Sequence, residues 1–275
     1  MKKITSIIIL GLVAVIGLIG CGNSKNKVEV QSESKVITYG KAAGPYTILF
    51  EDAIIPILEK DGYSFKAVEF SDLLQNNTAL NEGEIDVNVE QHTAYMENFN
   101  KSQNGKLIAL TPIPTVPAAI YSSVHDNLDN ITDGARIALP NDASNASRAY
   151  AALQKAGWIK LDDSVNIALV TDSDIVENPY NLDLIEMDSS NIPRSLEEFD
   201  YAIIPGSIAY SSGIDLASGL LYEDILEHLL LQVVIHEDNK DSEWAKAIAD
   251  AYNFDEFKKY MEKNNDGSWY LHYDN

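Results

Sequence analysis

The segment 107–122 is apolar along nearly its whole length, yet it contains Pro112, Pro114 and Pro117. Proline removes a backbone donor and breaks helices, and within sheets it is confined to edges and bulges. The segment therefore cannot form one helix or one central strand. We expect it to be an extended connector that runs from one lobe of the protein to another.

A second crossing is expected near residues 229–235, ahead of two helical patterns that close the chain at 242–252 and 255–263. Two crossings would divide the chain into two lobes, with both ends of the sequence in the first. A cleft between lobes that are joined by two strands suits a ligand trap that closes by a hinge motion. The predicted lobe I is residues 36–118 plus 230–275, and lobe II is residues 119–229.

Short apolar runs alternate with amphipathic stretches through the body of the chain. Runs bounded by turn residues predict strands, and apolar residues at helical spacing predict helices. The alternation indicates an α/β fold with mostly parallel sheets. The predicted strands are residues 36–40, 65–70, 85–89, 135–140, 165–170, 182–187, 200–205 and 232–236. The predicted helices before the last two are residues 48–60, 72–82, 93–102, 144–156 and 193–199.

The amino terminus has the layout of a secretory signal that ends in a lipobox, residues 1–20. Lys2 and Lys3 precede an apolar run over residues 4–19, and Cys21 is the only cysteine. The alternative is a plain transmembrane anchor, but the run is shorter than the roughly 20 apolar residues that a spanning helix needs. We expect the mature chain to begin at Cys21, lipid-anchored to the cell membrane and extracytoplasmic.

Residues 21–35 are polar and are expected to form a linker between the lipid and the folded body. The formal net charge of the chain is −22 at pH 7. Such a surface repels phosphate backbones and anionic headgroups, so we expect no nucleic-acid partner. The simpler role of the charge is solubility. With a single cysteine, the body must fold without an internal disulfide bond.

A first polar cluster follows the predicted strand 85–89 and contains His92 and Tyr95. Ligands of open α/β sheets bind beyond the carboxyl ends of strands, which is where these side chains fall. The structural alternatives are a histidine that hydrogen-bonds locally at a helix start and a tyrosine that packs in the core. The sequence alone leaves both open.

A second polar cluster follows the strand 135–140 and contains Asn141, Asn145 and Arg148. Ser144 or Asn145 is expected to cap the next helix, whose free N–H groups favour an anion. The planar guanidinium of Arg148 matches a carboxylate. The cluster therefore predicts a ligand with a free carboxylate, although a helix cap beside a surface arginine would show the same pattern.

Several motifs follow one another in a fixed order: Phe70-Ser71-Asp72, Gly83-Glu84-Ile85-Asp86, Gln91-His92, Pro140-Asn141-Asp142 and Glu223-Asp224. In this order they resemble the NlpA or MetQ family of methionine-binding lipoproteins, over nearly all of residues 36–260. The resemblance implies a two-lobe periplasmic-binding-protein fold of type 2. It also implies a small amino-acid-like solute, methionine or a related amino acid or dipeptide, that is delivered to the permease and ATPase of an ABC importer. In such proteins the position of Arg148 holds the ligand carboxylate, and those of His92, Tyr95 and Asn141 line or support the cleft.

Some expected pocket positions differ from the family pattern. Leu73 stands where a tyrosine is usual, and Val89 and Glu90 stand where aromatic residues are usual. Pro205 and Ser207 lie in the stretch that replaces the asparagines around the ligand's amino-acid head. Fewer rings mean less apolar contact and fewer sulfur–ring contacts. If Glu90 faces the cleft, it favours a cationic ligand group; the alternative is an acid that faces solvent.

Two other functions are compatible with this organisation, because a fold does not fix a function. One is an enzyme on a similar two-lobe scaffold. No Gly-x-Ser-x-Gly motif, phosphate-binding loop or metal-spaced histidine pair is found in the chain, so we expect neither an enzyme nor a cofactor or metal. The other is a surface lipoprotein with a divergent pocket and a role in sensing or adhesion.

Overall fold

The proline-rich segment leaves one β-sheet and enters another in the computed structural model, which describes residues 36–273. Its first part is β4 (Leu107–Pro112), and its last part is β5 (Ala119–Tyr121). The chain returns between β11 (Leu221–Tyr222) and β12 (Leu231–His236), which belong to the two different sheets. The expected two-lobe fold with two crossover strands is confirmed. The lobe boundaries stay predictions.

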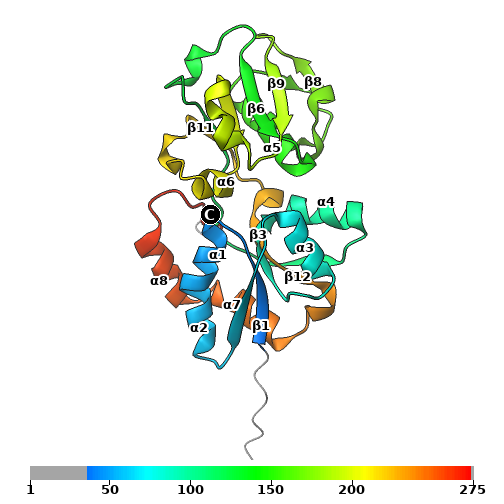
Figure 1. Ribbon diagram of the computed structural model, residues 1–275, viewed down its shortest axis with the longest axis vertical. Helices are drawn as coiled ribbons and strands as arrows, with labels where there is room; N and C mark the ends of the chain where they lie inside the picture. The colour runs from blue at the N-terminus through cyan, green and yellow to red at the C-terminus, as the bar shows by residue number, and fades with distance from the viewer. Residues whose placement is uncertain (1–35, 274–275) are drawn as a thin grey trace, which may run out of the picture. The chain divides into compact units, whose positions relative to one another are not determined.

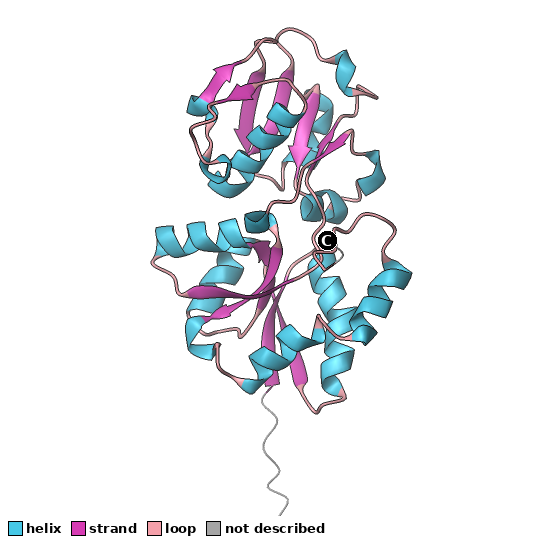
Figure 2. Ribbon diagram, turned by 180° about the vertical axis from the view of Figure 1, so that it is seen from behind, coloured by secondary structure: helices cyan, strands magenta, loops and turns pink. Residues whose placement is uncertain are grey.

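The first group of elements is built from both ends of the described chain, drawn in blue to cyan and in orange to red in Figure 1. The parallel pair β1 (Val36–Lys41) and β2 (Ser64–Glu69) is joined by a bridge between Tyr39 and Val87 to a sheet of order β3-β12-β4. Helices lie on both sides of these strands (Figure 2). The helices are α1 (Pro45–Leu49), α2 (Ile55–Glu59), α3 (Leu73–Asn81), α4 (Thr93–Gln103), α7 (Glu243–Ala251) and α8 (Asp255–Asn264). The remaining strand of the sheet β3-β12-β4 is β3 (Asn88–His92).

The second group, green to yellow in Figure 1, surrounds a sheet of order β11-β5-β10-β6-β9. Its remaining strands are β6 (Arg136–Pro140), β9 (Asp183–Met187) and β10 (Tyr201–Ile204). A small antiparallel pair, β7 (Lys160–Leu161) and β8 (Ile175–Glu177), stands beside it. Its α-helices are α5 (Ala143–Lys155) and α6 (Gly206–Ser211).

Short helical turns complete the elements. A π-helical turn, η1 (Phe50–Ile54), separates α1 from α2, and Pro56 in the first turn of α2 explains it, because proline cannot supply the N–H of a regular helix. The 3₁₀ turns are η2 (Leu128–Asn130), η3 (Ile167–Leu169), η4 (Asp172–Asp174), η5 (Ile192–Glu198), η6 (Leu216–Ser218), η7 (Glu227–Leu229) and η8 (Glu237–Asn239).

Most predicted elements are present, but two expectations are wrong. Residues 165–170 do not form a strand, because the side chain of Asn166 accepts a hydrogen bond from the N–H of Ala168 at 3.0 Å and begins a 3₁₀ turn. The sheets are not mostly parallel: β12 is antiparallel to both of its neighbours, and β5 is antiparallel to β10 and β11. The crossover strands cause this, since they enter each sheet against its other strands.

The two crossovers are hydrogen-bonded to each other. The N–H of Ile113 donates to the carbonyl of Leu231 at 2.8 Å, and the N–H of Leu231 donates to the hydroxyl of Thr115 at 3.0 Å. Thr115 also pairs with Tyr270 near the carboxyl end through two backbone hydrogen bonds of 3.0 and 2.8 Å. The point where the chain passes between the sheets is thus fixed by backbone hydrogen bonds from three separate segments.

We expect Gly206→Ala to destabilise the protein at this crossing. A methyl group on Gly206 would lie 2.6 Å from the carbonyl oxygens of both Val116 and Pro117, which are backbone atoms that cannot move aside alone. Overpacking of this kind lowers the free energy of unfolding by about 1–3 kcal/mol. Urea denaturation followed by circular dichroism measures this free energy of unfolding. Ser211→Ala, on the exposed side of the same helix, should change it by less than about 0.5 kcal/mol; equal effects would contradict the crowding.

Candidate functional site

A cavity of about 550 Å³ opens at the carboxyl ends of strands from both groups. The segments that follow β3, β6, β9 and β10 all contribute to its wall, which is where ligands of α/β proteins bind. Its volume lies within the range of small-molecule sites, about 300–1,000 Å³. All seven ligand-binding residues predicted from the sequence line it, namely Glu90, His92, Tyr95, Asn141, Asn145, Arg148 and Ser207.

Other lining residues were missed by the sequence analysis as site residues. They come from the start of α3 (residues 71–74), from the turn after β9 (residues 188–190), and from Gln91, Asp142, Pro205, Ile208 and Leu231. Leu73 and Pro205 had been noted only as departures from the family pattern. The turn at 188–190 gave no signal beyond its position after a predicted strand, and that position could have identified it.

Arg148 lies in a buried ion pair that the sequence did not predict. Its Nε and Nη2 donate to the two carboxylate oxygens of Glu223, and both side chains are only 4% exposed. Glu223 also accepts a hydrogen bond of 2.6 Å from the N–H of Ala118 in the first crossover. Burial disfavours the charge on Arg148, but the neighbouring Glu223 carboxylate outweighs it and raises the pKa of the guanidinium.

The guanidinium retains donors for a ligand. Of the five N–H groups of an arginine, two point to Glu223 and one, on Nη1, reaches Oδ1 of Asn145 at 3.2 Å. One hydrogen on Nη1 and one on Nη2 have no acceptor among the described residues, and Arg148 lines the cavity. A carboxylate can therefore bind there without displacing Glu223.

The amino terminus of α5 is capped by Asp142, so the expectation of Ser144 or Asn145 as the cap is wrong. The Asp142 carboxylate accepts from the N–H of Asn145 at 3.1 Å and from the Ser144 hydroxyl at 2.9 Å. Aspartate reaches the free N–H groups because its backbone is extended at this position. The helix end therefore already holds an anion of the protein.

His92 both begins a helix and faces the cavity. Its Nδ1 accepts from the N–H of Tyr95 at 3.2 Å, so Nε2 carries the proton and donates to Oδ1 of Asn145 at 3.4 Å. Burial and then the positive charge of Arg148 lower the pKa of His92 to about 3. The ring is therefore neutral at physiological pH and links α4 to α5 across the cavity.

Glu90 faces the cavity from the middle of β3, which settles the direction that strand alternation had left open. It is partly buried, and its Oε1 accepts a hydrogen bond from the Thr47 hydroxyl. Burial raises the pKa of Glu90 to about 7, although Thr47 acts in the opposite direction. A carboxyl group with this pKa changes its charge near neutral pH.

The rest of the wall is aliphatic and polar. Leu73, Leu74, Ile208 and Leu231 line the cavity, and Tyr95 supplies the one phenol ring among the described lining residues. Burial raises the pKa of Tyr95 to about 12, so the phenol stays neutral. The cavity thus offers few aromatic contacts to a thioether.

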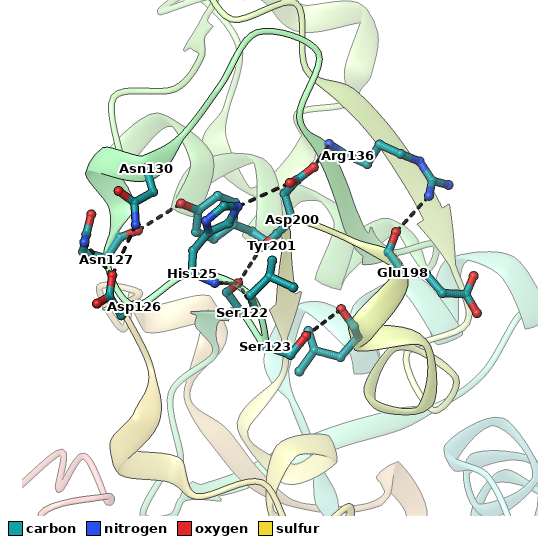
Figure 3. Close-up of polar contacts among 12 residues, drawn as sticks. Ser122, Ser123, His125, Asp126, Asn127, Asn130, Arg136, Glu198, Asp200 and Tyr201 are labelled. Atoms are coloured by element: carbon teal, nitrogen blue, oxygen red, sulfur yellow. Dashed lines mark hydrogen bonds and ion pairs between the residues drawn. The ribbon is translucent and has the colours of Figure 1, made fainter.

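A serine, a histidine and an aspartate also meet away from the cavity, on the second group of elements (Figure 3). The Ser122 hydroxyl donates to the backbone carbonyl of Asp200 at 2.6 Å and accepts from the N–H of His125 at 2.9 Å. The His125 ring reaches the Asp200 carboxylate at 3.3 Å. Because these bonds of the serine go to backbone groups, the arrangement holds a turn and does not present a serine to a base.

Within residues 36–273, no group of three or more His, Cys, Asp and Glu side chains is placed to hold a metal ion. Over the same residues, every helix falls short of the length and apolar character that would let it cross a bilayer. The predicted lipidation site Cys21 and the signal peptide lie outside the described residues.

We expect Glu223→Gln to lower the free energy of unfolding by about 3–5 kcal/mol, because it leaves the Arg148 charge buried without its partner. Chemical denaturation measures the loss. Asp224→Asn is the matched control: its pair with Lys155, at 2.6 Å, is exposed, and its loss should change stability by less than about 1 kcal/mol. Similar effects of the two variants would contradict the importance of the buried pair.

Comparison with known proteins agrees with this architecture. Residues 37–270 match the model of the NlpA lipoprotein family. The D-methionine-binding lipoprotein MetQ of Escherichia coli (strain K12) is 34% identical over 255 residues, which cover 92% of each chain.

Solved structures are similar over most of their length. A nutrient binding protein from Burkholderia cenocepacia bound to methionine superposes with a TM-score of 0.79 at 31% identity, covering 85% of this chain and 98% of that one. The methionine binding protein MetQ gives a TM-score of 0.78 at 35% identity, covering 85% and 96%. With a family match that spans nearly all the described residues, this chain belongs to the NlpA lipoprotein family.

Proposed function

We propose that this protein is the substrate-binding lipoprotein of an ABC importer. It captures a small amino-acid-like solute, methionine or a related amino acid or dipeptide, in the cavity at the strand ends. The names of its relatives support this function, since they include methionine-binding lipoproteins and a nutrient binding protein bound to methionine. The protein binds and releases its solute without chemical change.

One observation carries the proposal: Arg148 lines a cavity of ligand size and keeps two N–H donors that have no acceptor among the described residues. The Glu223 carboxylate fixes the guanidinium from its other edge, so the donors are oriented before the ligand arrives. A preorganised fork of this kind suits the carboxylate of an amino acid. Asn145, held by His92 and Asp142, completes the polar side of the site.

Closure of two lobes would bury the solute. Lobe I consists of residues 36–118 plus 230–275 and lobe II of residues 119–229, with the hinge at 112–117 and 229–232. The hydrogen bonds between the two crossovers support this hinge, because they keep both strands together while the lobes move. The closed form would be the one that the permease and its ATPase accept.

The protein is held at the outer face of the cell membrane by lipid on Cys21. The lipobox sequence and the name of the family support this anchor. Because a single acyl chain gives only marginal membrane binding, the lipid on Cys21 would need to supply more than one hydrocarbon chain.

We expect Arg148→Lys to weaken binding of the amino-acid solute at least tenfold. Lysine keeps the positive charge beside Glu223, so the fold is preserved, but it lacks a second edge for the ligand carboxylate. A thermal-shift screen of the refolded, ligand-free mature protein against amino acids and dipeptides identifies the solute, and calorimetry gives the affinity. A ligand at 100 times its Kd should add about 2.7 kcal/mol of stability.

Arg136→Lys is the matched control, because Arg136 packs over the Phe199 ring at 5.0 Å and lies outside the cavity. The affinity of the Arg136→Lys variant for the amino-acid solute should equal that of the wild type. If the folded wild type binds no amino acid or dipeptide, the transport function is wrong and the alternative of a sensing or adhesion lipoprotein gains support.

We expect Cys21→Ser to release the protein from the membrane. A hydroxyl cannot form the thioether to the lipid, so the variant should incorporate no labelled palmitate and leave the membrane fraction. Ser24→Ala, in the same polar stretch, should remain labelled and membrane-bound. A Cys21→Ser protein that stays in the membrane fraction without label would indicate that the apolar amino terminus is the anchor.

A further inference from the structure

The cavity has an excess of acidic side chains. Glu90, Asp72, Asp142 and Asp188 line it, and Arg148 is the only lysine or arginine among the described lining residues. The charge of Arg148 is already balanced by Glu223, with which it forms a buried ion pair. His92 adds no charge, because burial lowers its pKa to about 3. With these carboxylates ionised, the cavity carries a clear net negative charge.

The three aspartates are tied to the backbone near them. Asp72 caps α3 by accepting from the N–H of Gln75 at 2.8 Å, and Asp142 caps α5. Asp188 accepts from the N–H of Ser190 at 2.9 Å. Each therefore has a local structural role, although its charge still contributes to the potential in the cavity.

Glu90 stands within a strand, but it also meets a helix end, because it lies at the start of α1, where the hydroxyl and the backbone N–H of Thr47 donate to its carboxylate. Its partner is Thr47, at the start of α1, and none of the ion pairs among residues 36–273 includes it. A second carboxylate oxygen of Glu90 faces the backbone at Gly44, where an added methyl group would lie 3.3 Å away. A partly buried carboxylate without a cation is unfavourable until a ligand supplies one.

We propose that the preferred solute is an amino acid with a positively charged side chain, whose carboxylate binds Arg148 and whose side-chain cation binds Glu90. This inference rests on the proposed function and names the substrate class of the same site. A zwitterion such as methionine brings no net charge and leaves the acidic excess unchanged. An additional ammonium or guanidinium group reduces that excess and gives Glu90 its partner.

Matched ligand pairs isolate the charge. Arginine and citrulline have nearly the same shape, and lysine and norleucine differ mainly in the terminal ammonium. Calorimetry on the mature wild-type protein at pH 8 should show arginine or lysine binding at least tenfold more tightly than its neutral counterpart and than methionine. Glu90→Gln should remove this preference by weakening the cationic ligand at least tenfold, while binding of the neutral ligand changes less than threefold.

The pH dependence gives a second readout. The pKa of Glu90 is raised to about 7 by burial, so below that pH the group is largely protonated and cannot attract a cation. The cationic ligand should bind about tenfold more weakly at pH 6 than at pH 8, and Glu90→Gln should bind it equally at both. Among the groups around Glu90, the phenols of Tyr46 and Tyr252 have raised pKa values and His92 a lowered one, so these stay neutral throughout, and Arg148 stays charged.

The outcomes separate this inference from the proposed function. If methionine, glycyl-methionine or norleucine binds as tightly as lysine and arginine, the charge selection is wrong while capture of amino acids stands. If the cationic ligand is preferred but Glu90→Gln binds it unchanged, the assignment to Glu90 is wrong. If no amino acid or dipeptide binds the folded wild type, both fail. Should Glu90→Gln not fold, the ligand pairs and the pH series on the wild type still decide.

Discussion

The buried pair of Arg148 and Glu223 is the interaction on which the site depends. Two charges removed from water are stable only when their hydrogen bonds are satisfied. Here Glu223 receives two bonds from Arg148 and one from the N–H of Ala118. The carboxylate thus orients the arginine that we propose as the ligand anchor and attaches it to the first crossover, so the proposed anchor and the proposed hinge share one buried group.

The same crossover explains how a proline-rich segment can run through the interior. Pro112, Pro114 and Pro117 have no N–H, which leaves few backbone donors to satisfy. The N–H groups of the other residues from 113 to 118 reach the Leu231 carbonyl, the Tyr270 carbonyl, the Tyr46 hydroxyl and the Glu223 carboxylate. Every donor is bonded to a distant part of the chain, so the extended conformation is specified without a regular sheet.

The cavity differs in chemistry from one built to hold a thioether. Aromatic rings favour methionine through apolar area and contacts with sulfur, whereas this wall carries Tyr95, aliphatic side chains and Glu90. In the proposed function, a family member can keep the carboxylate anchor at Arg148 and still change its ligand through the opposite wall.

The sequence by itself determined the two crossovers, most of the helices and strands, and seven of the residues that line the cavity, because proline positions, apolar periodicity and motif order are local properties of the chain. Only the tertiary structure decided that Glu90 faces inward, that Asp142 is the cap of α5, and that Glu223 meets Arg148 from 75 residues away. Nothing in local sequence specifies which buried charge will find which partner, since that depends on how separate strands and helices pack around a common interior.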